Sequence, residues 1–136
     1  MLSWLHRLVS KPPAPLKGVP KVRREKTYSA ETGFVYQYFY MGYREAKRGE
    51  DEGYEHLFSV SSDRASRFTL RVFLSRRVLE QWKKTNDRKL IATEQYAVVK
   101  LSLFQAFDEG TDLGGENSEV VVRPEQLEEH VKTLDL

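Results

Sequence analysis

Residues 93–109, TEQYAVVKLSLFQAFDE, form the longest stretch of the chain that keeps a helical pattern and contains neither glycine nor proline. At about 100° per residue, its apolar side chains gather on one broad arc, which holds Tyr96, Ala97, Val99, Leu101, Leu103, Phe104, Ala106 and Phe107. The opposite arc is polar and holds Glu94, Gln95, Ser102, Gln105 and Glu109. The pattern predicts a helix that packs on the core, capped by Thr93 and stopped by Gly110.

Lys100 interrupts the apolar arc of this helix, because it falls between Tyr96, Phe104 and Phe107. A lysine in an apolar setting loses proton affinity and can act as a base or form an imine. A lysine can also extend its four-carbon stem until the ammonium reaches the edge of the core or a carboxylate. We expect the second arrangement, since one lysine between packed neighbours is commonly accommodated in this way.

Three segments rich in aromatic and β-branched residues, 34–43, 54–61 and 67–74, predict β-strands. Residues 44–53 between the first two are charged and contain glycine, which is typical of a hairpin loop. Short connections of this kind favour an antiparallel three-stranded meander.

The rest of the chain predicts two further helices and one short strand. Ser75 precedes a helix in which Val78, Leu79 and Trp82 share a side, and this helix is expected to end at 86–87. Residues 110–118 are expected to form a loop, and 119–123 a short strand. Pro124 is suited to open a last helix. The predicted fold class is α+β: a small, mainly antiparallel sheet, consisting of the meander and a short C-terminal strand, covered by two to three helices.

The first 26 residues have the composition of an extended N-terminal arm, and residues 27–136 that of one α+β domain. Apolar side chains in 2–9 follow a helical spacing, but two turns of helix are too short to be stable alone. Four prolines in 12–20 then favour extended backbone. This combination suggests a docking segment on a stiff basic tether. Packing of the segment on its own domain and a role in organelle targeting stay open.

The chain of 136 residues contains no cysteine, so it carries no disulfide framework and no thiolate site. No window approaches the roughly 20 apolar residues that cross a bilayer. These features predict a cytoplasmic protein that does not span a membrane, with peripheral contact to a membrane surface as an open alternative.

Charge is unevenly distributed along the chain, although the formal net charge is only +2. Residues 1–26 contain seven basic residues and one acidic residue, and residues 64–89 contain nine and two. Residues 108–136 contain nine acidic and two basic residues. Such segregation can attract an external polyanion, or the two ends of the domain can neutralise each other, which is the arrangement we expect.

No catalytic motif, cofactor or metal site is predicted. The three histidines, His6, His56 and His130, are scattered, and the EQLEEH segment lacks the paired histidines of a zinc-peptidase helix. No phosphate-binding glycine loop and no nucleophile elbow are present.

The leading functional hypothesis is a non-enzymatic accessory or adaptor subunit that docks on a larger protein assembly through its arm. The expected contact residues are apolar and basic: Leu2, Trp4, Leu5, Arg7, Leu8, Val9, Arg23 and Arg24. The alternative hypothesis is binding of single-stranded RNA or DNA on an open sheet face, with stacking side chains beside phosphate-binding ones. Its candidate residues are Tyr36, Tyr38, Tyr40, Arg67 and Arg71.

Overall fold

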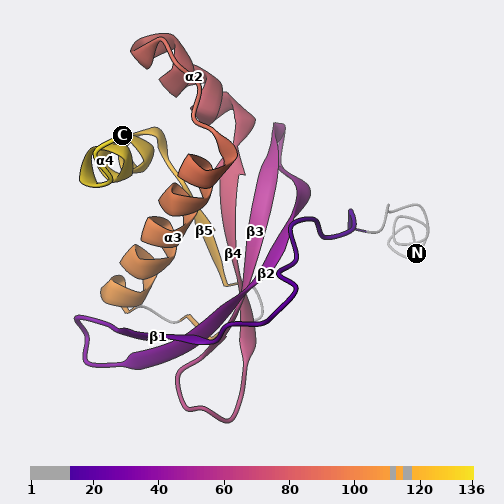
Figure 1. Ribbon diagram of the computed structural model, residues 1–136, viewed down its shortest axis with the longest axis vertical. Helices are drawn as coiled ribbons and strands as arrows, with labels where there is room; N and C mark the ends of the chain where they lie inside the picture. The colour runs from indigo at the N-terminus through magenta and orange to yellow at the C-terminus, as the bar shows by residue number, and fades with distance from the viewer. Residues whose placement is uncertain (1–12, 111–112, 115–117) are drawn as a thin grey trace, which may run out of the picture.

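A computed structural model describes residues 13–110, 113–114 and 118–136, and its core is one five-stranded sheet with helices on one side (Figure 1). The strands are β1 (Lys26–Ser29), β2 (Val35–Arg48), β3 (Asp51–Ser61), β4 (Phe68–Ser75) and β5 (Glu119–Val121). The helices are α2 (Arg76–Asn86), α3 (Ala92–Glu109) and α4 (Pro124–Thr133). The α+β class is confirmed.

The sheet is mixed and has more strands than predicted. Strands β1 to β4 pair antiparallel in chain order, and β5 pairs parallel to β4. The prediction of a mainly antiparallel sheet made of a three-stranded meander and one short C-terminal strand was therefore wrong in the number of strands, and it did not foresee the parallel pairing of β5. Strand β1 is four residues long and follows the charged arm, so its pattern was too short to detect. Strand β5 is parallel because the chain returns to the sheet through α2 and α3, a crossover that parallel pairing requires.

The predicted loop at 44–53 is instead the end of a long β-ribbon. Arg48 pairs with Asp51, so only Gly49 and Glu50 form the turn. Opposite charges face each other across the ribbon, as in the pair between Lys47 and Glu52. These cross-strand pairs allow a highly charged sequence to form strands.

A β-bulge in β2 changes which side chains share a face. The register shifts between Tyr40 and Gly42, and Gly42 has a φ of 124°. The extra residue places Tyr43 opposite His56, on the same face as Tyr40. Without the bulge, strict alternation along the strand would place Tyr43 on the other face with Phe39.

The helix ends follow the predicted signals with one exception. Ser75 caps α2 by accepting hydrogen bonds from the next residues, and Gly110 ends α3 with a φ of 64°. However, α3 begins before Thr93, and the Glu94 carboxylate accepts the Ile91 N–H at 3.0 Å. Pro124 occupies the first turn of α4, as predicted.

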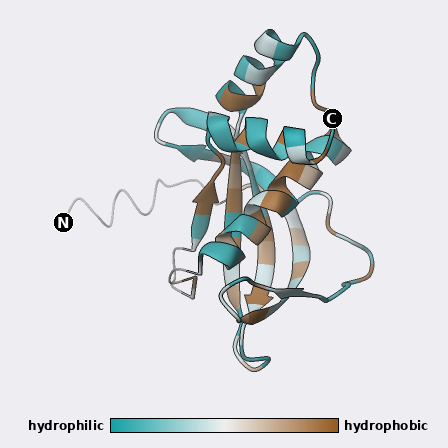
Figure 2. Cartoon of the chain, turned by 90° about the vertical axis from the view of Figure 1, so that its left-hand side faces the viewer, coloured by the Kyte–Doolittle hydropathy of each residue, from teal (hydrophilic) through white to brown (hydrophobic). Residues whose placement is uncertain are grey.

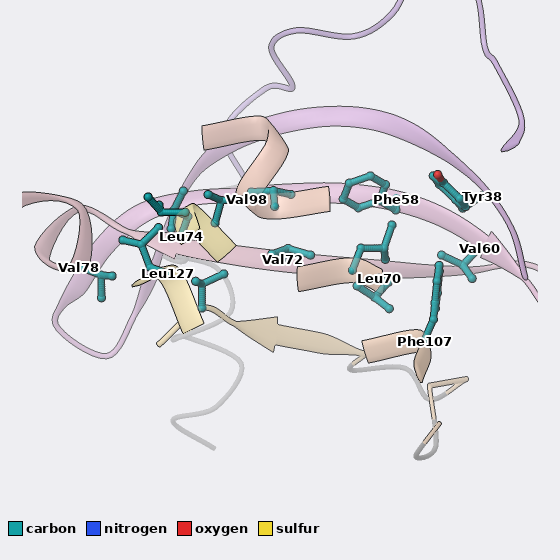
Figure 3. Close-up of a cluster of buried hydrophobic side chains, with 14 of the residues drawn as sticks. Tyr38, Phe58, Val60, Leu70, Val72, Leu74, Val78, Val98, Phe107 and Leu127 are labelled. Carbon is teal, nitrogen blue, oxygen red and sulfur yellow. The ribbon is translucent and has the colours of Figure 1, made fainter. Parts of the chain in front are cut away.

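The core lies between the sheet and α3, where Phe58, Leu70 and Val72 meet Val98 and Phe107 (Figure 3). Hydrophobic segments follow the strands, behind more hydrophilic helix surfaces (Figure 2). In the described residues, no helix combines the length and apolarity of a bilayer span.

Candidate functional site

A cleft opens where the arm passes between β2 and α3. It has a volume of about 370 Å³ and carries basic side chains from two separate stretches of the chain, residues 21–26 and α3. We call it the cationic cleft; its charged residues are Lys21, Arg24, Lys26 and Lys100, and its aromatic ones include Tyr38, Tyr40 and Tyr96. None of the described residues that line it is acidic.

Lys100 lines this cleft from α3, where it lies on the same side of the helix as Tyr96 and Phe104. Its Nζ lies 5.3 Å from the centre of the Tyr38 ring and 5.4 Å from that of Phe104, within the range of cation–π attraction. Burial, and then the nearby Lys26, lower the pKa of Lys100. Within the described part of the chain, Lys100 forms no ion pair with a carboxylate.

A second hollow adjoins the cationic cleft and shares Tyr40 and Tyr96 with it. Its volume is about 420 Å³. We call it the aromatic hollow; its ring-bearing residues are Tyr40, Tyr43, Tyr54, His56 and Tyr96, and Ala92, Thr93 and Gln95 complete it. Tyr43 and Tyr54 lie edge to face at 5.4 Å, as do Tyr40 and Tyr96 at 4.9 Å. The cationic cleft and the aromatic hollow therefore lie next to each other, with the Tyr40 and Tyr96 rings as their common border.

Tyr40 and His56 are hydrogen-bonded at the floor of the aromatic hollow, with 2.9 Å between the Tyr40 hydroxyl and His56 Nδ1. Burial raises the pKa of Tyr40, and the neighbouring Tyr96 and Tyr43 raise it further. Burial also lowers the pKa of His56 from 6.5 to about 4. Both groups are therefore uncharged at neutral pH.

The buried His56 should make stability depend on pH. The unfolded chain binds a proton at the ordinary pKa, whereas the folded imidazole stays neutral down to about pH 4, so stability falls as pH falls through this interval. We expect the free energy of unfolding to decrease by roughly 2 kcal/mol between about pH 7 and 5 from this group alone. Urea denaturation at both pH values measures the difference.

The matched variant is His56→Asn, whose amide can also bond to Tyr40 but does not titrate. We expect it to remove most of this pH dependence. His130, whose pKa burial also lowers, is present in both proteins, so the comparison isolates His56. Equal loss of stability in both proteins would show that His56 does not carry the effect.

The structure describes only two of the residues that were predicted to bind a partner, Arg23 and Arg24. Leu2, Trp4, Leu5, Arg7, Leu8 and Val9 lie outside the described residues. Arg23 and Arg24 are exposed; the Arg23 guanidinium lies 5.1 Å from the centre of the Phe39 ring, and Arg24 lines the cationic cleft.

The residues predicted to bind nucleic acid are not brought together. Tyr36 and Tyr38 are each 5% exposed and face α3, and Tyr40 on the same side is half-buried. Arg67 and Arg71 lie on the opposite side of the sheet, where Arg67 donates to Ser59 and rests over the Phe39 ring. The expected platform of stacking rings beside phosphate-binding arginines therefore does not form.

The ion pairs of the basic segment 64–89 are made with carboxylates outside the acidic C-terminal segment. Within the described residues, these pairs reach Glu25, Asp51, Glu52 and Glu94. Glu119, from the acidic segment, pairs instead with Arg48 of the ribbon. No ion pair joins the two segments in the described part of the chain, although the pairing of β4 with β5 places Arg71 beside Glu119, so mutual neutralisation stays a prediction.

The described residues contain no group of three histidine or acidic side chains that could hold a metal ion. Comparison with protein-family models, with curated proteins and with solved structures finds no match. The chemistry of the site must therefore be argued from its own residues.

The sequence pointed to Lys100 and Tyr40 individually but missed most of their neighbours in the site. Tyr43 joins it through the β-bulge, whose sequence signal is Gly42, and Tyr54 joins it because it lies two residues before His56 on β3. Lys21 and Lys26 join it because the arm folds back along the sheet, for which the sequence has no local signal.

Proposed function

We propose that this protein is a non-enzymatic accessory subunit that docks on a larger protein assembly through its N-terminal arm. The observation that carries the proposal is the attachment of the arm to the free edge of β2. Lys17 and Tyr43 exchange two backbone hydrogen bonds, of 2.7 and 3.0 Å. The arm is thereby fixed to the domain at Lys17, which follows the predicted docking segment at 2–9 in the sequence.

Glycine is required at the attachment point. A Cβ on Gly42 would lie 2.6 Å from the Lys17 carbonyl oxygen, and the φ of 124° is unfavourable for other residues. The arm can therefore run against the sheet only because β2 has no side chain here. Such a fixed tether reduces the entropy lost when the segment binds a partner.

The attached arm also presents apolar side chains outward. Val19 is 57% exposed and Val22 is 66% exposed. Together with the basic Arg23 and Arg24, they offer a partner both apolar contact area and charge.

The test is quantitative affinity purification of the C-terminally tagged full-length protein and of matched arm variants. Leu5→Asp with Leu8→Asp changes the apolar side of the predicted segment, whereas Ser3→Asp with Ser10→Asp adds the same charge to its polar side. We expect the leucine variant to lose its partner at least about tenfold, equivalent to 1.4 kcal/mol, and the serine variant to retain it. Both variants should unfold at the temperature of the native protein.

Association that survives the leucine substitutions and the deletion of residues 1–12 would overturn the proposal. Flotation with anionic phospholipid vesicles, without any captured protein, would replace the protein partner with a membrane surface.

The nucleic-acid hypothesis keeps weaker support, since its tyrosines are covered by α3 while its arginines lie on the outer side of the sheet. A titration with single-stranded RNA at two salt concentrations tests it, because phosphate contacts weaken steeply as salt rises.

A further inference from the structure

We propose that the cationic cleft and the aromatic hollow together bind a small aromatic anion, with a carboxylate or phosphate group at Lys26 and Lys100 and its ring among Tyr43, Tyr54 and Tyr96. This site is separate from the predicted docking segment at 2–9, although its cleft shares Val22 and Arg24 with the surface that the arm offers a partner.

The positive charge of the cationic cleft is not compensated by carboxylates. Lys21, Arg24, Lys26 and Lys100 converge on one cleft, and in the described part of the chain none of them forms an ion pair. Elsewhere on the described surface, arginines such as Arg67, Arg77 and Arg88 do pair with carboxylates. The cleft therefore has an excess of cations that its own surroundings do not neutralise, and an anion placed among them would be stabilised.

The ammonium groups of Lys26 and Lys100 share the cleft, whose described lining contains no carboxylate. Lys26 lines the same cleft as Lys100, and its positive charge is one of the causes that lower the pKa of Lys100. Lys100 is half-buried, so this repulsion is poorly screened by water. An anionic oxygen between the two groups would accept a hydrogen bond from each and turn the repulsion into attraction.

The aromatic hollow beside the cleft is suited to an aromatic ring. Its rings belong to four tyrosines and one histidine that is neutral at physiological pH, so it offers flat, uncharged surfaces. Aromatic rings bind such surfaces by stacking or edge contacts. Because Tyr40 and Tyr96 border both hollows, one ligand can place its anionic group in the cleft and its ring in the hollow. The volumes of about 370 and 420 Å³ are in the range of small-molecule sites.

The experiment uses the full-length protein and four probes: 1-naphthoate, 1-naphthyl phosphate, the neutral 1-naphthalenemethanol and inorganic phosphate. Calorimetry gives each affinity, and amide chemical shifts locate the contact. We expect both naphthyl anions to bind and to shift the amides of Tyr40, Tyr96 and Lys100. The two anions distinguish a carboxylate from a phosphate ligand, and the two remaining probes should bind much more weakly.

The decisive variant is Lys100→Met, which keeps the stem and removes the charge. We expect it to weaken binding of the naphthyl anions about tenfold or more and to leave the neutral alcohol unaffected. Lys83→Met, at an exposed lysine on α2, is the matched control and should change nothing. Lys26→Met provides the same test at an exposed strand residue, where the substitution does not disturb the core.

Three results would overturn the proposal. These are failure of both naphthyl anions to bind in the millimolar range, an equal effect of the Lys100 and Lys83 substitutions, and binding of the neutral alcohol as tightly as the anions. If inorganic phosphate bound as tightly as naphthyl phosphate, the aromatic half of the proposal would be wrong.

Discussion

Replacement of Phe107 with alanine is expected to lower the free energy of unfolding by about 4 kcal/mol. Phe107 has no exposed surface and stacks on Tyr36, with 4.2 Å between the ring centres. The rings of Tyr28 and Tyr38 lie 5.7 and 6.0 Å away. Removal of the ring therefore leaves a cavity where α3 meets β1 and β2, and rigid aromatic neighbours cannot collapse to fill it.

The matched control for this prediction is Phe34→Ala. Phe34 is 56% exposed, so the same change in side chain removes little buried area, and we expect a loss below about 1 kcal/mol. Chemical denaturation of both variants, followed by circular dichroism, gives the two values. Equal losses for the two phenylalanines would mean that α3 does not pack on this end of the sheet as described.

Helix boundaries were predictable because their signals lie within a few residues of each boundary. The Ser75 hydroxyl can only cap what immediately follows it, and the left-handed backbone at Gly110 needs no information from elsewhere. The start of α3 escaped prediction because Glu94 performs the capping from inside the helix, through the Ile91 amide.

The sheet was less predictable because strand pairing joins distant residues. The short β1 is secured by contacts that its sequence does not encode, such as the hydrogen bond of 2.7 Å from the Tyr28 hydroxyl to the Asp108 carboxylate of α3. The charged end of the β2–β3 ribbon has the composition of a loop, and only its cross-strand charge pairs explain why it forms strands. Local propensity is a weak guide where pairing supplies the stability.

In the site, too, only the features with a local sequence signal were predictable. Lys100 stood out because it broke a strong local pattern, and the structure does place it among aromatic rings. Its ammonium lies over the Tyr38 ring, in a cleft that Lys26 also lines. Its position depends on how the arm and β1 fold against β2, which no periodicity within α3 reveals.

Replacement of Glu55 with glutamine is expected to lower the free energy of unfolding by about 3 kcal/mol. The Glu55 side chain is only 8% exposed and accepts hydrogen bonds from Arg44 at 2.5 Å and from Arg48 at 2.8 Å. Burial alone would raise the pKa of Glu55, but the hydrogen bonds and charges of Arg48 and Arg44 outweigh it and lower the pKa. Glutamine keeps the shape of the side chain but removes its charge. Its amide N–H group would face two arginine side chains, which are themselves donors and offer it no acceptor.

This prediction lies at the low end of the range for breaking a buried ion pair, because Arg44 and Arg48 keep side-chain exposures of 19% and 28% and can regain some water. Glu52→Gln is the matched control on the same strand. Glu52 is 51% exposed and pairs with Lys47 and Arg76 at 3.4 Å, so its loss should cost less than about 1 kcal/mol.

The pKa of Glu55 is lowered on folding, so its contribution is complete above about pH 5 and is lost as pH falls further. The difference between the two variants, measured by denaturation at neutral pH, should therefore shrink in acid; a constant difference would indicate that packing rather than charge stabilises the outer side of the sheet.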